Sequence, residues 1–407
     1  MSTNIRDITL DRIRTLCLLL MLVDHTLHAY ALYWGKFWFV YDSERDVLYD
    51  VLYLHNNSII IPLLFFVSGH FVYQSWLKHR FIRYALRRFI HLMIPAILGV
   101  LFLVPLMSYG KFVQQGENNL GFISFLTQSF FAGKTLQAGP MWVLYVIFAH
   151  SILAATLFQI LGKQRVERFS VQLAQKVSQN PLTIMLPVMI LCIFLLGFSD
   201  LRWGAPWWIG WGKVFSVQGS RFLVQALFFW LGVMRGTVPL HIREQVMDTQ
   251  ETKYKSLFIA WLIVGIAYIT YAIGWFDAGA YSDEVYRHFI KGGRWSEVWP
   301  VVKEYGSGVW IRTTLHSIYL PVQVALYVFT VHKCKQRNWG FVDRISPYGL
   351  GLFLFHPIFV IWLQVAFDGV TLPALFKILI IVPIALGGAL LISRWGLRLY
   401  YKMRVAR

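Results

Sequence analysis

Apolar segments long enough to cross a lipid bilayer recur along the whole chain. A transmembrane helix needs about 20 mainly apolar residues, and helices satisfy their own backbone hydrogen bonds in lipid. We predict about ten spans, at residues 13–33, 58–76, 89–109, 141–161, 182–198, 219–235, 256–276, 311–332, 347–367 and 372–394. The expected fold is an all-α polytopic membrane protein in which residues 1–407 form one integral-membrane domain, with no separate soluble domain.

The composition supports the same class. Hydrophobic residues make up 57% of the chain and charged residues 14%, whereas soluble domains contain about 25% charged residues. A formal net charge of +18 would favour nucleic acid as a partner of a soluble protein, but here we expect no nucleic acid, because the charge follows the membrane topology. Cys17, Cys192 and Cys334 lack the spacing of a disulfide framework or a metal site, so no metal is expected.

The distribution of basic residues predicts the topology. With ten spans, Lys and Arg are about twice as frequent in the loops on the side of the N-terminus as in the opposite loops. The positive-inside rule therefore places both termini in the cytoplasm. The first apolar segment lacks a secretory cleavage site, so we expect it to remain as a membrane anchor.

The first predicted span carries ionisable residues beside its apolar run: Asp11, Arg14, Asp24, His25 and His28. A helix turns about 100° per residue, so all of these except Asp24 fall within a stripe about 100° wide. Arg14 and His25 lie about 16 Å apart along the helix axis. Each ionisable group at membrane depth costs roughly 2.5–3.5 kcal/mol, so such groups usually face a protein interior or a wet cavity.

This stripe supports two interpretations. One is a buried polar stripe that fixes helix packing. The other, which we favour, is a channel lined by Arg14 and His25 with chemistry at the imidazole. Asp24 points about 100° away from its neighbour, so it cannot easily orient the ring of His25 from the same helix.

Other polar residues interrupt later spans. Ser68 and Gly69 break the second span and form either a packing notch or part of a site, and His70 follows them. Trp142 begins the fourth span as an interfacial anchor or a site lid. His356 precedes Pro357 in the middle of the ninth span, where a proline frees a backbone carbonyl. His356 is either a packed core histidine or a pocket residue.

A dense cationic patch follows the second span. Arg83, Arg87 and Arg88 recur at helical spacing near the predicted cytoplasmic surface. They are topogenic charges that hold this loop inside, and they also suit a phosphate clamp, because guanidinium groups bind phosphate through bidentate, charge-assisted bonds.

Three outer segments are also distinctive. Residues 120–131 form either a short interfacial helix or loop packing. Residues 203–211 are rich in Trp and Gly, which suits an aromatic belt or a surface for stacking sugar rings. The loop at 277–310 is the longest on that side, and we expect it to cap an outward-facing site.

Five motifs together support a family resemblance: LDRIR followed by His25 eleven positions after Arg14, FFVSG at 65–69, ALRRFIHLMIP at 85–95, PMWVLYV at 140–146, and LGLFLFHPIF at 350–359. In this order, and over most of the chain, they resemble acyltransferase family 3 of integral membrane proteins. Within that family the chain is most similar to the branch that succinylates periplasmic glucans. Two positions depart from the pattern, since His70 and His91 stand where the family usually has other residues.

The resemblance implies a multi-pass O-acyltransferase of the bacterial inner membrane. The donor would be cytoplasmic acyl-CoA, either acetyl-CoA or succinyl-CoA, and the acceptor a hydroxyl of a periplasmic or other extracytoplasmic glycan. His25 would act as a general base or as the acyl carrier, and both roles remain open. The expected catalytic residues are His25, Asp24, Ser68 and His356; the expected donor-binding residues are Arg14, Arg83, Arg87 and Arg88; the expected substrate-binding residues are Trp142, His28 and His70.

A different class of function also fits the polar stripe. A transporter or flippase for an anionic solute or a lipid-linked sugar would use the same residues as a pathway. Such a protein would move its substrate without releasing free thiol from acyl-CoA.

Overall fold

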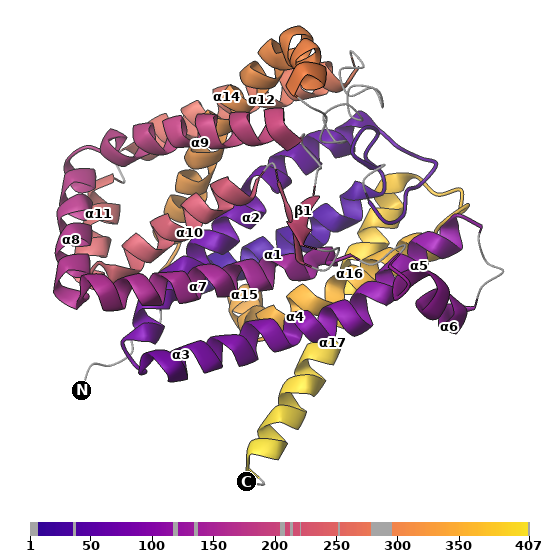
Figure 1. Ribbon diagram of the computed structural model, residues 1–407, viewed down its shortest axis with the longest axis horizontal. Coiled ribbons are helices and arrows are strands. Elements are labelled where there is room, and N and C mark those ends of the chain that lie inside the picture. Colours follow the sequence, from indigo (N-terminus) through magenta and orange to yellow (C-terminus); the bar gives the residue numbers. More distant parts are fainter. Residues whose placement is uncertain are drawn as a thin grey trace.

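Long helices make up most of the protein in the computed structural model, which describes residues 7–35, 38–116, 121–133, 137–203, 208–211, 215–219, 221–250, 253–277 and 295–405. The α-helices are α1 (Ile8–His28), α2 (Val47–Trp76), α3 (Phe81–Arg88), α4 (Ile94–Leu98), α5 (Val104–Gln114), α6 (Phe122–Phe125), α7 (Trp142–Leu161), α8 (Lys163–Gln179), α9 (Leu182–Trp203), α10 (Phe222–Thr237), α11 (Leu240–Gln250), α12 (Tyr254–Asp277), α14 (Trp295–Lys333), α15 (Gly340–Ile345), α16 (Gly349–Ala366) and α17 (Ala374–Val405). Figure 1 shows them packed as one bundle.

Among the described residues, eight helical segments are long and apolar enough to cross a membrane: Val47–Trp76, Phe81–Gln114, Gly139–Leu161, Leu182–Asp200, Tyr254–Trp275, Ser307–Lys333, Gly340–Ala366 and Ala374–Arg398. A ninth is obtained if α10 and α11, which are bent by 114° at their junction, count as one broken span. The prediction of an all-α polytopic membrane protein is confirmed.

Two of the ten predicted spans differ from these segments for clear reasons. The first coincides with α1, which carries four charged residues within its 21 positions. The sixth coincides with α10, which is only 16 residues long and ends before Pro239. Both helices nevertheless pack inside the bundle, where α1 contacts α2, α14, α16 and α17. Their polar residues therefore meet protein rather than lipid.

The third span is a single curved unit from Phe81 to Gln114. Two π-helical turns interrupt it, at Phe89–Met93 and Gly99–Leu103, and each lies just before a short α-helix that contains a proline near its start. Proline removes a backbone donor and crowds the preceding turn, and a π-turn is one way to continue a helix past that defect.

Glycines allow α2 and α10 to approach closely. A Cβ atom on Gly69 would lie 2.0 Å from the Phe229 carbonyl oxygen, and one on Gly232 would lie 1.9 Å from the Phe66 carbonyl oxygen. Small residues permit such backbone contact between membrane helices. These distances support the packing-notch interpretation of Gly69.

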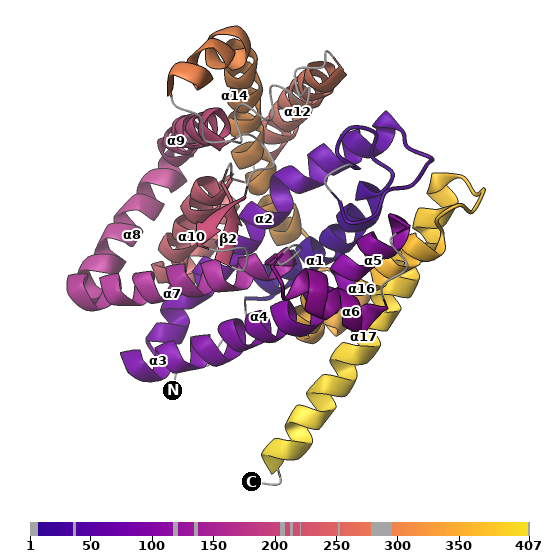
Figure 2. The same cartoon turned by 45° about the vertical axis from the view of Figure 1, so that its right-hand side comes forward.

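The two ends of the bundle carry different short elements. Figure 1 shows α8 and α11 side by side at one end and α6 at the other. Of the two alternatives for residues 120–131, the structure shows a short helix, α6, followed by a π-turn to Phe130. The C-terminal part of α17 extends away from the other helices in both views (Figures 1 and 2).

One element was not predicted: a β-hairpin of β1 (Trp208–Trp211) and β2 (Phe215–Gln218), paired antiparallel. Its first strand lies in the Trp-rich segment 203–211, in which α9 ends at Trp203 and residues 204–207 lie outside the described residues. Most of the loop predicted to cap the site, residues 278–294, also lies outside them, and α14 begins at Trp295 within its C-terminal part.

Candidate functional site

The structure joins two histidines that are 331 positions apart in the sequence. His25 Nδ1 of α1 lies 3.0 Å from His356 Nε2 of α16, and the two rings stack with centroids 5.0 Å apart. His356 is completely buried, whereas His25 is only partly buried. The pair thus has one enclosed member and one member that reaches accessible space.

The hydrogen bonds of His356 determine which nitrogen of His25 is free to react. His356 Nδ1 lies 2.7 Å from the Leu352 carbonyl oxygen, which can only accept, so Nδ1 carries the proton. In a neutral ring His356 Nε2 is then the acceptor, and His25 Nδ1 must donate to it. This arrangement leaves the lone pair of His25 on Nε2, where a base or nucleophile needs it.

The position of His356 follows from its helix. Pro357 follows it directly inside α16 and cannot donate to the Phe353 carbonyl one turn earlier. Gly349 at the start of α16 lets this helix approach α1, since a Cβ atom there would lie 3.2 Å from a Leu18 methyl carbon. The sequence LGLFLFHPIF therefore positions the His356 ring against α1.

A short segment after α1 covers His25. The Trp38 ring lies 4.7 Å from the His25 ring and 5.1 Å from the His28 ring, measured between centroids. Trp38 Nε1 donates to Gln364 Oε1 at 2.8 Å, and Gln364 Nε2 donates to the carbonyl oxygens of His25 and Thr26 at 3.2 and 3.1 Å. Gln364 on α16 thereby ties the cover to the helix end that carries His25.

Two buried acids hold the covering segment in place. Asp50 of α2 accepts from the backbone N–H groups of Leu32 at 2.8 Å and Trp34 at 3.0 Å. Asp42 accepts from Lys377 Nζ of α17 at 2.8 Å, and both side chains are almost completely buried. A buried ion pair of this kind is costly to break, so the segment is fixed at both ends.

His28 lies on the same side of α1 as His25. Its ring packs 4.3 Å from that of Tyr53 on α2, and its Nε2 is buried without a hydrogen-bond partner among the described residues. The prediction that His28 contributes to substrate binding remains consistent with this position, since a buried donor or acceptor without a partner is unfavourable.

Apart from Asp24, which was predicted as a catalytic residue, the members of a group of ionisable residues near one end of α1 were not predicted as a site. It consists of Asp24, Asp200, Arg221, Arg312 and His316, which we call the outer cluster. Asp200 accepts from Arg312 Nη2 at 2.6 Å. Arg221 interacts electrostatically with Asp24, Asp200 and His316. Asp24 Oδ1 is buried and has no hydrogen-bond partner among the described residues. Asp24 thus belongs to this cluster, and His356 instead orients His25.

Three members of the outer cluster could be recognised in the sequence as charged residues at the ends of predicted spans. Asp200, Arg221 and Arg312 lie at the ends of three predicted spans, 182–198, 219–235 and 311–332, all on the side opposite the termini. Charges at the ends of spans predict topology, but tertiary packing determines whether they converge. Residues from α9, α10 and α14 meet here beside the side chain of Asp24.

At the other end of α1, Arg14 and Arg12 have different surroundings. Arg12 is buried and donates to Asp343 through Nε and Nη2, both at 2.8 Å. Arg14 pairs with Asp11 at 3.2 Å, yet 38% of its side chain is exposed and its Nε is buried without a hydrogen-bond partner among the described residues. Arg12 is therefore structural, and Arg14 retains capacity for a further anion.

The cationic patch lies on α3, which packs against α2 and α7. Arg83 and Arg87 are exposed, and Arg88 is partly buried with Nε 3.2 Å from the Tyr84 hydroxyl. Their field acts on a neighbour: partial desolvation and the cations Arg87, Arg83 and Lys78 lower the pKa of His79 in the loop before α3. That these arginines bind the donor remains a prediction.

The remaining predicted residues lie in other parts of the fold. The Trp142 ring packs against Phe65 of α2 at 6.2 Å, one helical turn from Ser68, which is half-buried. His70, two residues after Ser68, is buried, and its ring nitrogens Nδ1 and Nε2 lie 3.2 Å from Arg235 Nη1 and 2.8 Å from Arg243 Nη1. A role of Ser68 or Trp142 at the reaction centre, and of His70 in substrate binding, remains a prediction.

A family model described as an acyltransferase domain matches residues 7–394, which is nearly the whole chain. The chain belongs to acyltransferase family 3. It is therefore a membrane acyltransferase. The comparisons with curated proteins and with solved structures gave no match.

The family assignment gives the histidine pair a context. An acyltransferase needs a base or nucleophile, and His25 Nε2 is the nitrogen left available by the hydrogen bonds of the pair. Within the described residues no group of three or more His, Cys, Asp or Glu side chains is arranged to hold a metal ion.

Proposed function

We propose that this acyltransferase moves an acyl group from cytoplasmic acyl-CoA to a hydroxyl of an extracytoplasmic glycan, with His25 as the general base. The observation that carries the proposal is the contact of His25 Nδ1 with His356 Nε2, which leaves His25 Nε2 unprotonated in the neutral pair. A partly accessible imidazole fixed by a buried partner is the arrangement that general-base catalysis requires.

The residues at the two ends of α1 suit the two substrates. The side chain of Arg14 is 38% exposed, and its Nε has no hydrogen-bond partner among the described residues, which fits a phosphate group of coenzyme A. His25 lies about 16 Å further along the helix, a separation comparable with the pantetheine arm. The outer cluster offers carboxylate and guanidinium groups beside Asp24, which suit the hydroxyl groups of a sugar.

The proposed reaction is a direct acyl transfer. The acceptor oxygen attacks the thioester carbonyl carbon while His25 Nε2 takes the hydroxyl proton, so that a carbon–oxygen bond forms. The carbon–sulfur bond then breaks, and the imidazolium returns its proton to the departing thiolate. The products are an O-acyl ester and free coenzyme A, and His356 holds the imidazolium through the Nδ1 proton. A nucleophilic His25 would use the same Nε2 atom.

The test is thiol release by the purified full chain. The protein in detergent is supplied with acetyl-CoA or succinyl-CoA, with and without a periplasmic glycan extract, and free thiol and glycan mass are measured. We expect glycan-dependent thiol release together with an ester mass shift, and both should be lost in His25→Gln. A transporter would release no thiol. His332→Gln serves as the matched control, because His332 is buried near the cytoplasmic end of α14, at Asp248, and outside the site.

A further inference from the structure

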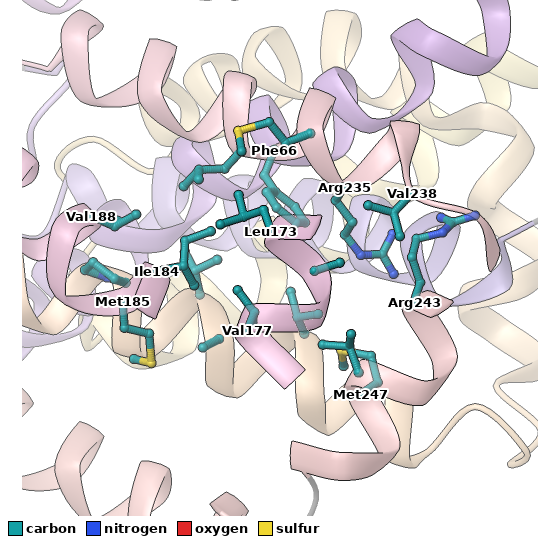
Figure 3. Close-up of a pocket in the computed structure, with 18 of the residues that line it drawn as sticks. Phe66, Leu173, Val177, Ile184, Met185, Val188, Arg235, Val238, Arg243 and Met247 are labelled. Atoms are coloured by element: carbon teal, nitrogen blue, oxygen red, sulfur yellow. The ribbon is translucent and has the colours of Figure 1, made fainter. Parts of the chain in front are cut away.

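A second feature lies outside the acyl-transfer site: an apolar pocket of about 260 Å³ between α2, α8, α9, α10, α11 and α14. Its wall is formed mainly by aliphatic, Met and Phe side chains, which include Phe66, Leu173, Ile184, Val188 and Met247 (Figure 3). An apolar cavity of roughly 150 Å³ holds a benzene ring, so this pocket has room for a longer aliphatic segment.

Two cations stand at one end of this pocket. Figure 3 shows the guanidinium groups of Arg235 and Arg243 on one side and the apolar side chains Ile184, Met185 and Val188 on the other. The pocket is therefore amphipathic along its length. A ligand that fits it has an anionic end and an aliphatic remainder.

The cations are only partly neutralised by the protein. Arg235 and Arg243 share the carboxylate of Asp7, at 3.4 and 3.2 Å from their Nη1 atoms. They also face the two ring nitrogens of His70, and a neutral imidazole can accept at only one of them. Arg243 Nε is buried without a hydrogen-bond partner among the described residues. Glu244, whose charge also acts on Arg243, is paired with Lys335. The two guanidinium groups that share Asp7 therefore leave a partly buried positive charge, which favours binding of an anion.

The helix that covers the pocket points to the source of the ligand. α8 crosses the end of the bundle and faces the pocket with Ser170, Leu173, Ala174 and Val177. Its other face exposes basic residues: Arg165, Arg168 and Lys176. An amphipathic helix with a basic face and an apolar face lies at a membrane surface and attracts anionic lipids.

We propose that this pocket binds one acyl chain of an anionic phospholipid, with the lipid phosphate against Arg235 and Arg243. The site lies on the side of the membrane predicted to be cytoplasmic, because Arg243 contacts Asp7 at the start of α1. It binds a lipid independently of the acyl-transfer reaction, and it would stabilise the junction of α8, α10 and α11.

The first test uses thermal unfolding of the purified full chain in neutral detergent. Dioleoylphosphatidylglycerol should raise the unfolding temperature of the wild type by several degrees, and dioleoylphosphatidylcholine should raise it much less. Ala174→Trp fills the pocket from α8, and Arg243→Gln removes a guanidinium; each should at least halve the shift. Arg168→Gln, an exposed cation on the other face of α8, should retain it.

Three results would overturn the proposal. They are an equal shift in Ala174→Trp and wild type, an equal shift with both lipids, and an equal shift with oleic acid, which would identify a fatty-acid site instead. Unfolding temperatures without added lipid report whether each variant is folded.

A second test needs no variant. Phosphatidylglycerol with a photoreactive group at the end of one acyl chain is added to the wild type and cross-linked. Adducts should map to pocket-lining peptides that contain Met185 or Met247. Adducts confined to exposed apolar residues of the described spans, such as Phe194, would contradict the proposal.

Discussion

His356 Nε2 accepts from His25 Nδ1 at 3.0 Å, and the Leu352 carbonyl oxygen, 2.7 Å from His356 Nδ1, fixes the direction of this hydrogen bond. The contact connects the first long helix of the chain with one near its end. It determines the tautomer of His25 and therefore the atom available for proton transfer. In the proposed reaction His356 acts through His25, as a positioning residue.

Replacing His356 should lower the rate of acyl transfer without removing the binding site for acyl-CoA. We expect His356→Ala to lower kcat about 10–100-fold, the range found when a group that orients a metal-bound histidine is removed. The KM for acyl-CoA should change little, and the pH profile of kcat should shift, because His25 loses the acceptor of its Nδ1 proton. Steady-state kinetics over a range of pH values measure all three. An unchanged pH profile with a uniform loss of folded protein would assign His356 a purely structural role.

The two arginines near the start of α1 should behave differently. Arg14→Ala should raise the KM for acyl-CoA roughly tenfold or more, because a hydrogen bond to a charged group contributes about 1.5–3 kcal/mol. Arg12→Ala should instead lower the unfolding temperature, since it leaves Asp343 without its two 2.8 Å hydrogen bonds. Titration of acyl-CoA in detergent and thermal unfolding of both variants distinguish the roles. Equal donor affinity in Arg14→Ala and wild type would contradict the phosphate contact.

The Asp42–Lys377 ion pair holds the segment that covers His25. Removing one partner of this pair should cost more stability than replacing both. Lys377→Met leaves Asp42 buried without its partner and should cost about 3–5 kcal/mol of stability, whereas the double variant with Asp42→Leu should recover much of the loss. The rate of acyl transfer should fall in the single variant, because Trp38, which packs against His25, belongs to the segment that this ion pair holds. Unfolding temperatures of both variants provide the measurement. A double variant less stable than Lys377→Met would show that the pair itself stabilises the fold.

The cationic patch on α3 can be probed through His79. Partial desolvation and the cations Arg87, Arg83 and Lys78 lower its pKa, so removing positive charge should raise the pKa towards the ordinary histidine value. Arg87→Gln should produce this rise in an NMR titration of the labelled ring, and Arg80→Gln, which is not among these cations, should produce a smaller one. At a pH below its ordinary pKa, a histidine whose pKa is lowered in the folded state destabilises that state. The folded protein should therefore also be more stable at acidic pH in Arg87→Gln. A lower pKa in Arg87→Gln would contradict the proposed field.

Local patterns were sufficient to predict much of the fold. Hydropathy located the membrane helices, and the 3.6-residue period predicted that His25 and His28 share one side of α1. The π-turns of the third span and the bend between α10 and α11 were not predicted, because they depend on how prolines are accommodated by neighbouring helices. The β-hairpin lies in a short segment whose Trp residues suggested an interface instead.

The candidate site was likewise predictable only in part from local sequence patterns. Arg14, His25 and His356 carried signals in the sequence, since each is an ionisable residue within an apolar segment. Their partners did not: no local pattern connects His25 with His356, or Asp24 with Arg221, across hundreds of positions. Contacts of this kind arise from tertiary packing, which single-sequence periodicity does not describe.

We propose that one passage beside α1 carries an acyl group from a donor on the Arg14 side to an acceptor on the far side. Inside-out inner-membrane vesicles from expressing cells test it most directly. The vesicles receive radiolabelled acetyl-CoA, or in parallel succinyl-CoA, in the external medium, and label is counted in the glycan released from their lumen. We predict label in the lumenal glycan with the wild type and background levels with His25→Gln. Labelling only after the vesicles are permeabilised, or equal labelling by His25→Gln, would contradict the account.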